Sequence, residues 1–286
     1  MKKIILFMFL YISLFAKMPE IVSVEWLKKH YNDKDLVIID VRDEKAFKKA
    51  HLKKAVNIPS LEKLFDKNNQ MKLPKLSYLK ELFSKAGIDN NSKIVVYGGK
   101  NPIWAARFYW ISEILGHNDV GLLKISFGNW KNGELPVTTE IYKPKYKNFI
   151  PKVDNSKLAT MLSTYLAINK EYIIDGRPYE FYIGKKSHAK RYGHIPSALN
   201  YPGSLTYDVT KNGSVIKSFE SLAKLYKGLP KDKPIILYCE DGADAAMNFL
   251  VLQKLGYQVS VYDGSWLEWG NNPNLPVEKT PRKLEK

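Results

Sequence analysis

The chain has 286 residues, of which 45% are hydrophobic and 13% aromatic, so it is long enough for two packed domains and is not a disordered chain. Its formal net charge is +16, yet the lysines are dispersed and no block of five or six like charges occurs. This pattern favours a solvated, lysine-rich surface over nucleic-acid binding, so we expect no nucleic-acid partner.

The first sixteen residues read as a leader. Two lysines precede an apolar run from Ile4 to Phe15, and Ala16 supplies a small residue for cleavage. This order is typical of a secretory signal peptide over residues 1–16, and the run is short for a membrane span of about 20 residues. Leu14 stands where a small residue is preferred, so an uncleaved anchor is the alternative. We predict export to a bacterial periplasm, with no stable membrane span once the leader is removed.

Strands and helices alternate after the leader. Leu36–Asp40 is a continuous apolar run that ends in an aspartate, which is typical of a buried parallel strand. This alternation predicts an α/β domain with a parallel sheet over residues 17–140. Further strands are predicted at 55–59, 94–97 and 120–123, and helices at 24–31, 44–49, 76–86 and 102–115.

A change of composition marks the end of this domain. Residues 139–154 hold four lysines and two prolines and show no clear period, so we predict a linker over residues 141–155. A second domain then covers residues 156–277 and opens with a helix predicted over 156–170. Residues 278–286 are predicted to be a tail.

The second domain repeats the pattern of the first. The offset between matched positions stays between 135 and 143 residues, which indicates a duplicated unit. In this register Cys239 corresponds to Gly98, so we predict that only the second copy is catalytic. The matched segments are 37–42 with 172–177, 51–57 with 194–200, 95–97 with 236–238, and 127–130 with 263–266.

Cys239 is the only cysteine of the chain and follows a strand-length apolar run, Ile235–Tyr238. Small residues come next, and a helical pattern begins near Ala246. Amide groups of such a loop converge on the sulfur, and the helix N-terminus adds partial positive charge, so the site favours a thiolate or a bound anion. The alternative is a buried cysteine that packs as a small apolar side chain. The position at a strand end favours a working cysteine, which requires an ionised sulfur that water can reach.

The chain resembles the tandem-domain rhodaneses, the sulfurtransferases of the thiosulfate and 3-mercaptopyruvate type. The most specific segment is Val259–Trp269, which is similar to the C-terminal signature of that family. The Asp-x-Arg strand ends, the turn Gly193–Pro196 and the loop that begins at Cys239 also fit. The resemblance covers nearly the whole chain after the leader. It implies two tandem rhodanese-like domains, each a parallel five-stranded sheet flanked by helices, with the site facing the partner domain.

The resemblance also implies a reaction. Cys239 attacks the outer sulfur of a sulfane donor and becomes a persulfide, and a nucleophilic acceptor then removes that sulfur. The implied partners are a small anionic sulfur donor, a thiol or cyanide acceptor, and a protein as a further possible acceptor, with no cofactor and no metal. The implied supporting residues are Asp175, Arg177 and His194, of which His194 is expected to be a structural turn residue. The loop implied to bind the substrate and persulfide is Glu240, Asp241, Gly242, Ala243, Asp244 and Ala245.

Acidic residues in this loop depart from the family pattern. Glu240 and Asp241 stand where thiosulfate enzymes carry basic residues and mercaptopyruvate enzymes carry small ones, and Phe181 stands where a donor-binding arginine is expected. Carboxylates beside a thiol oppose its ionisation and repel dianions. We therefore expect weak activity with thiosulfate, or a polysulfide, persulfide or protein donor. Glu240 and Asp241 are predicted to point into solvent and Asp244 to be the helix N-cap.

Two other functions are compatible with parts of this pattern. A non-catalytic sulfur carrier or binding module could use the same fold to hold sulfur. A phosphatase or arsenate reductase would need an arginine six positions after the cysteine to bind the oxyanion, and that position is Ala245. We therefore favour the sulfurtransferase, with the sulfur carrier as its alternative.

Overall fold

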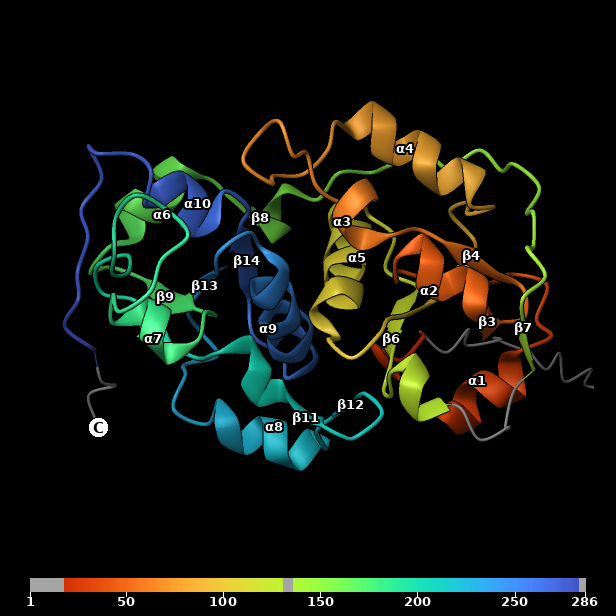
Figure 1. Ribbon diagram of the computed structural model, residues 1–286. Helices are drawn as coiled ribbons and strands as arrows, with labels where there is room; N and C mark the ends of the chain where they lie inside the picture. Colours follow the sequence, from red (N-terminus) through yellow and green to blue (C-terminus); the bar gives the residue numbers. More distant parts are fainter. Residues whose placement is uncertain (1–17, 131–135, 283–286) are drawn as a thin grey trace, which may run out of the picture.

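The computed structural model describes residues 18–130 and 136–282, so the predicted leader at 1–16 and the last residues of the predicted tail lie outside the described residues. The duplication appears as two sheets of five parallel strands with equivalent strand orders (Figure 1). The first sheet runs β1 (Ile21–Val22), β6 (Val120–Leu123), β5 (Lys93–Tyr97), β2 (Leu36–Asp40), β4 (Ala55–Asn57); the second runs β8 (Leu158–Ala159), β14 (Val259–Tyr262), β13 (Ile235–Tyr238), β9 (Tyr172–Asp175), β10 (Leu199–Asn200). The predicted fold class is therefore confirmed.

Helices flank each sheet. The first domain contains α1 (Val24–His30), α2 (Glu44–Lys49), α3 (Ser60–Lys63), α4 (Leu76–Lys85) and α5 (Ile103–Ile114). The second contains α6 (Met161–Ala167), α7 (Tyr179–Tyr182), α8 (Phe219–Leu225), α9 (Ala243–Lys254) and α10 (Ser265–Trp269). Two short antiparallel pairs complete the fold: β3 (His51–Leu52) with β7 (Val137–Thr138), and β11 (Tyr207–Val209) with β12 (Ser214–Ile216).

The helix predicted over residues 156–170 is shorter than expected. A short 3₁₀ turn and strand β8 occupy its first part, and α6 begins only at Met161. The reason is a capping box, in which the Thr160 side chain accepts the Ser163 amide and the Ser163 side chain accepts the Thr160 amide. Of the described residues, no helix is long and apolar enough to cross a membrane.

The two central helices join the domains. Eleven of the twelve residues of α5 and nine of the twelve of α9 are buried, as expected for helices that are largely apolar around their circumference. They lie side by side between the two sheets (Figure 1). The Tyr109 and Phe249 rings meet there, with centroids 6.5 Å apart. One hydrophobic core therefore runs through both domains.

Backbone hydrogen bonds reinforce this contact. The β11–β12 hairpin of the second domain reaches the first, where the Ser126 amide donates to the Ser214 carbonyl at 3.0 Å and the Ile216 amide donates to the Lys124 carbonyl at 2.9 Å. The predicted linker has no regular secondary structure over 141–154, yet it is tied to the first domain. Its Lys152 amide donates to the Leu115 carbonyl at 2.9 Å. The domains therefore form one packed unit, in which the strand end at Cys239 lies near the first domain.

Candidate active site

A sharp turn after β13 places Cys239. Gly242 adopts a left-handed conformation with φ of +90°, which glycine enters at little cost, and the chain then enters α9. The turn points the Gly242 amide at the Cys239 sulfur, with N and Sγ 3.1 Å apart. Two hydrogen bonds from the first turn of α10 hold the cysteine backbone, since its amide donates to Ser265 Oγ at 3.2 Å and its carbonyl accepts from the Trp266 amide at 2.9 Å. The predicted convergence of amides on the sulfur is thus partly formed.

The state of the thiol differs from the prediction. Cys239 has no exposed surface, and burial raises the pKa of its thiol well above the usual value, assisted by the charges of Asp241 and Asp244. The amides of Ala245 and Asp241 act in the opposite direction but do not offset the burial. The expectation of an ionised sulfur open to water is therefore wrong for this conformation, which has the buried thiol given as the alternative, because desolvation outweighs the loop amides.

The N-cap of α9 also differs from the prediction. Gly242 is the N-cap residue, and Asp244 is the second residue of the helix. The left-handed glycine turns the chain two residues earlier than expected. Asp241 makes the side-chain bond at this end, because its Oδ1 accepts the Ala243 amide at 3.2 Å and lies 4.0 Å from the sulfur. Asp241 therefore folds back on the loop rather than into solvent.

Asp244 is partly buried beside the loop. Burial raises the pKa of its carboxyl from 3.8 to about 7, with further contributions from the charges of Asp241, Asp175 and Glu240. The turn at Gly203 packs against it, because a Cβ atom built on Gly203 would lie 3.0 Å from Asp244 Oδ1. This carboxyl is therefore poised to exchange a proton near neutral pH.

Glu240 is turned inward, contrary to the expectation of solvent exposure. Its side chain is 16% exposed, and one carboxylate oxygen lies 3.6 Å from Arg177 Nη1. Its pKa is raised, chiefly by burial, while the Arg177 charge lowers it. The Glu240 carbonyl accepts the Leu267 amide at 3.1 Å, so the backbone of this residue also anchors the loop.

Arg177 and Asp175 form a buried ion pair at the end of β9. The guanidinium donates to both carboxylate oxygens at 2.6–3.1 Å, and its Nη2 donates to the Gly193 carbonyl at 2.7 Å. The first domain repeats the arrangement with Arg42 and Asp40. Since it occurs in both copies, this pair organises the strand end and is not specific to the thiol.

His194 is placed by stacking and a backbone bond. Its ring lies 3.8 Å from the Tyr182 ring, and Nδ1 is 2.7 Å from the Tyr182 carbonyl oxygen. His51 repeats both contacts on Phe47 in the first domain, at 3.7 and 2.8 Å. These are the contacts of a structural residue, as expected for His194.

Sequence reasoning missed a contribution of the first domain to this loop. Arg107 on α5 lies 2.8 Å from Asp263, which follows β14, and also contacts Gly242. A usable signal was present, because Arg107 and Glu113 are the only charged residues of an otherwise apolar helix.

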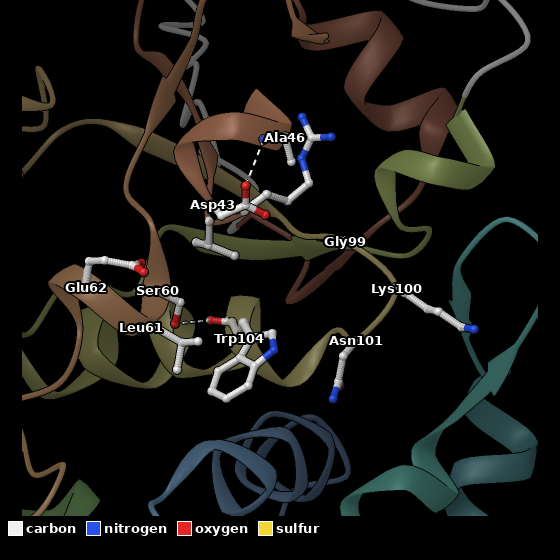
Figure 2. Close-up of a pocket in the computed structure, with 11 residues that line it drawn as sticks. Asp43, Ala46, Ser60, Leu61, Glu62, Gly99, Lys100, Asn101 and Trp104 are labelled. Carbon is white, nitrogen blue, oxygen red and sulfur yellow. Dashed lines mark hydrogen bonds between the residues drawn. The ribbon is translucent and has the colours of Figure 1, made fainter. Parts of the chain in front are cut away.

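A cavity of about 290 Å³ in the first domain is lined by Gly99, Lys100 and Asn101, which follow Gly98 in the loop after β5 (Figure 2). Trp104 and Leu61 lie close together there, and Lys100 points away from them. Its Asn101 accepts a hydrogen bond from the Tyr207 hydroxyl of the second domain at 3.2 Å. The position that matches Cys239 is a glycine, so the cavity offers no thiol. Among the described residues, no cluster of three or more His, Cys, Asp or Glu could hold a metal ion.

Comparisons with known proteins agree with this geometry. A model of the rhodanese-like domain matches residues 23–133 and again 155–272. A Mycolicibacterium smegmatis protein, whose name describes it as a candidate thiosulfate sulfurtransferase, is 31% identical over 277 residues, covering 92% of this chain and 99% of the relative. The sulfur carrier protein TtuD of Thermus thermophilus is 32% identical over 283 residues, covering 91% and 97%. The crystal structure of SseA from Escherichia coli, a 3-mercaptopyruvate sulfurtransferase, superposes with a TM-score of 0.75 at 26% identity over 86% of this chain and 98% of that one.

Proposed function

Because the chain belongs to the rhodanese family and is a sulfurtransferase, we propose that Cys239 carries the transferred sulfur as a persulfide. The observation that carries the proposal is the Gly242 amide, which donates to the Cys239 sulfur at 3.1 Å from a loop at a strand end. Such a donor stabilises negative charge on a sulfur atom. Among the described residues no other cysteine is available.

The reaction runs in two displacements. The Cys239 thiolate attacks the outer sulfur of the donor, the donor S–S bond breaks, and the remainder of the donor leaves with the electron pair. An acceptor nucleophile then attacks the outer sulfur of the persulfide and releases the Cys239 thiolate. Both steps conserve charge and electrons without a redox partner, and ping-pong kinetics follow.

The buried thiol cannot begin the two displacements as it stands. With no exposed surface and a raised pKa, Cys239 must lose its proton and become accessible before the first displacement. Turnover therefore includes an opening of the loop or of the domain contact above it. Such gating steps are common in enzymes that close over their site.

The acidic loop disfavours thiosulfate as the donor, because thiosulfate is a compact dianion whereas a polysulfide spreads its charge over a longer chain. Asp241 and Asp244 both raise the thiol pKa, so their charges act at the sulfur and would repel thiosulfate. No arginine takes the expected donor-binding position, where the Phe181 ring instead lies 5.2 Å from that of His188. We therefore propose a polysulfide, a persulfide or a protein-bound sulfane sulfur as the donor, and a thiol as the acceptor.

Steady-state assays test the proposal. The wild-type protein is supplied with thiosulfate, 3-mercaptopyruvate or polysulfide, each with an excess of a thiol. The first thiol takes the sulfur as a persulfide and a second thiol reduces it to sulfide, whose release is measured above the rate without protein. We expect the highest kcat/KM with polysulfide and no turnover by Cys239→Ser. A strong preference for thiosulfate contradicts the interpretation of the acidic loop, and turnover by Cys239→Ser contradicts the mechanism.

A sulfur carrier is the second candidate, favoured by the 32% identity to a protein named as a sulfur carrier and by the buried, weakly acidic thiol. A carrier would hold its sulfur until a specific protein partner arrives. Adding cyanide or a small thiol to the loaded protein separates the candidates. Rapid discharge supports the enzyme, and a persulfide stable to both supports the carrier.

We also propose that the protein is exported and acts in a bacterial periplasm, on the basis of the leader sequence at 1–16. Cell fractionation and N-terminal sequencing of the mature protein test this. A cytoplasmic protein that retains Met1 would contradict it.

A further inference from the structure

The first domain places one charged side chain against the loop that holds the thiol. Arg107 lies on α5, which packs along α9, and it has no exposed surface. Its guanidinium carbon lies 4.5 Å from the ring centroid of Phe65 and 4.7 Å from that of Trp110. Burying a cation costs much free energy unless a partner compensates its charge, so we expect Arg107 to have a specific partner.

The partner of this cation belongs to the other domain. Arg107 Nη1 donates to Asp263 Oδ1 at 2.8 Å, and within the described chain Nε and Nη2 have no hydrogen-bond partner. Asp263 Oδ2 accepts the Leu73 amide at 2.6 Å, which is a second contact to the first domain. Asp263 is therefore held by the first domain through both of its carboxylate oxygens.

Asp263 connects directly to the cysteine. Two residues further along the chain, the Ser265 hydroxyl accepts the Cys239 amide at 3.2 Å, and the Trp266 amide donates to the Cys239 carbonyl. A shift of Asp263 would therefore move the groups that hold the backbone of Cys239. This is the first route from Arg107 to the thiol.

A second route passes through Gly242. A Cβ atom built on Gly242 would lie 2.4 Å from Arg107 Nη1, so the guanidinium occupies the space where any other residue would carry its side chain. The amide of the same glycine donates to the Cys239 sulfur at 3.1 Å. Arg107 thus packs directly on the residue whose amide points at the sulfur.

From these two routes we propose that Arg107 is a positioning residue, by which the domain without a cysteine holds the Gly242 amide on the sulfur of Cys239. The proposal rests on the proposed function of Cys239, because positioning matters only if that sulfur reacts. The first domain then contributes a side chain that positions the active-site loop. Positioning errors of about 1 Å can lower enzyme rates by a factor of about 100.

Two matched substitutions test the proposal. Arg107→Met removes the cation that touches the loop, whereas Lys254→Met removes another interdomain cation, which lies 3.5 Å from Glu20 at the far end of α9. Arg107→Lys is a milder variant that keeps the charge and serves if Arg107→Met fails to fold. Hydrogen exchange of the peptide that contains Gly242 is followed for each protein, together with kcat and KM.

We expect Arg107→Met and, to a smaller degree, Arg107→Lys to raise exchange at 240–243 and to lower kcat about 10-fold to 100-fold with KM changed less. Lys254→Met should leave both properties within about two-fold of the wild type. Unchanged exchange at Gly242 in both Arg107 variants would overturn the proposal. Equal increases in exchange over the whole interface would also overturn it, since they indicate domain docking alone.

The exchange measurement separates this proposal from the proposed function. It reports the Gly242 amide whether or not the protein transfers sulfur. If wild-type Cys239 forms no persulfide while exchange still depends on Arg107, the proposed function is wrong. Arg107 then stabilises the Gly242 loop without a role in catalysis.

Discussion

Replacing Asp244 by asparagine should stabilise the protein at alkaline pH and make the thiol more acidic. Burial, with the charges of Asp241, Asp175 and Glu240, raises the pKa of Asp244 from 3.8 to about 7. Asparagine has nearly the same shape but cannot ionise. The substitution therefore removes a buried charge that both destabilises the fold and raises the pKa of Cys239.

The sign and size of the effect follow from proton linkage. A carboxyl whose pKa is higher in the folded than in the unfolded protein binds more protons when folded, so stability falls as pH rises from about 4 to about 7 and is then constant. Each pKa unit corresponds to 1.36 kcal/mol, which gives a loss on the order of 4 kcal/mol by pH 8. About 1.5 kcal/mol of this loss is already present at pH 5. The advantage of Asp244→Asn should therefore grow by about 2.5 kcal/mol between pH 5 and pH 8.

Urea unfolding followed by tryptophan fluorescence measures this difference at the two pH values. Asp208→Asn is the matched control, because that side chain is 68% exposed on β11. It should change stability by less than about 0.5 kcal/mol at either pH. A difference between wild type and Asp244→Asn that is the same at pH 5 and pH 8 would refute the reasoning.

Three further outcomes are expected. Gly242→Ala should lower the free energy of unfolding by at least about 1–2 kcal/mol, because alanine at φ of +90° is strained and its Cβ would meet Arg107. Urea titration measures this loss, and an unchanged unfolding midpoint would contradict the contact with Arg107. Arg177→Met should cost about 3–5 kcal/mol, because it leaves the Asp175 carboxylate buried without its partner; a loss below about 1 kcal/mol would show that water replaces the arginine. In an alkylation series with a thiol-reactive dye, Cys239 should react slowly at pH 7 and faster only at alkaline pH, because its pKa is raised; rapid labelling at pH 6 would contradict the buried, protonated state.

The repeated sheets were predictable because each central strand is a short apolar run with a marked end. Leu36–Asp40 and Tyr172–Asp175 both finish in an aspartate that binds the arginine two residues later. Because the aspartate and the arginine are only two residues apart, the Asp-x-Arg pattern alone is enough to predict this bond. The structural position of His194 followed for the same reason, since His51 repeats it in a domain without cysteine.

The state of the loop was not predictable, because it depends on groups distant in sequence. Cys239 is fully buried in a loop against which Arg107 of the first domain packs, and Glu240 turns inward toward Arg177, which lies 63 residues earlier. The prediction of Asp244 as the N-cap of α9 was wrong for a different reason. Both Gly242 and Asp244 are acceptable N-caps, and the left-handed φ of Gly242 that decides between them depends on the folded loop.

The most direct test of sulfur transfer through Cys239 is the intact mass of the protein after one exposure to polysulfide. We predict a gain of one sulfur atom, located by peptide mapping on the peptide that contains Cys239, absent in Cys239→Ser and lost again when cyanide is added. A wild-type protein that gains no sulfur, or a Cys239→Ser variant that gains it equally, would contradict the account.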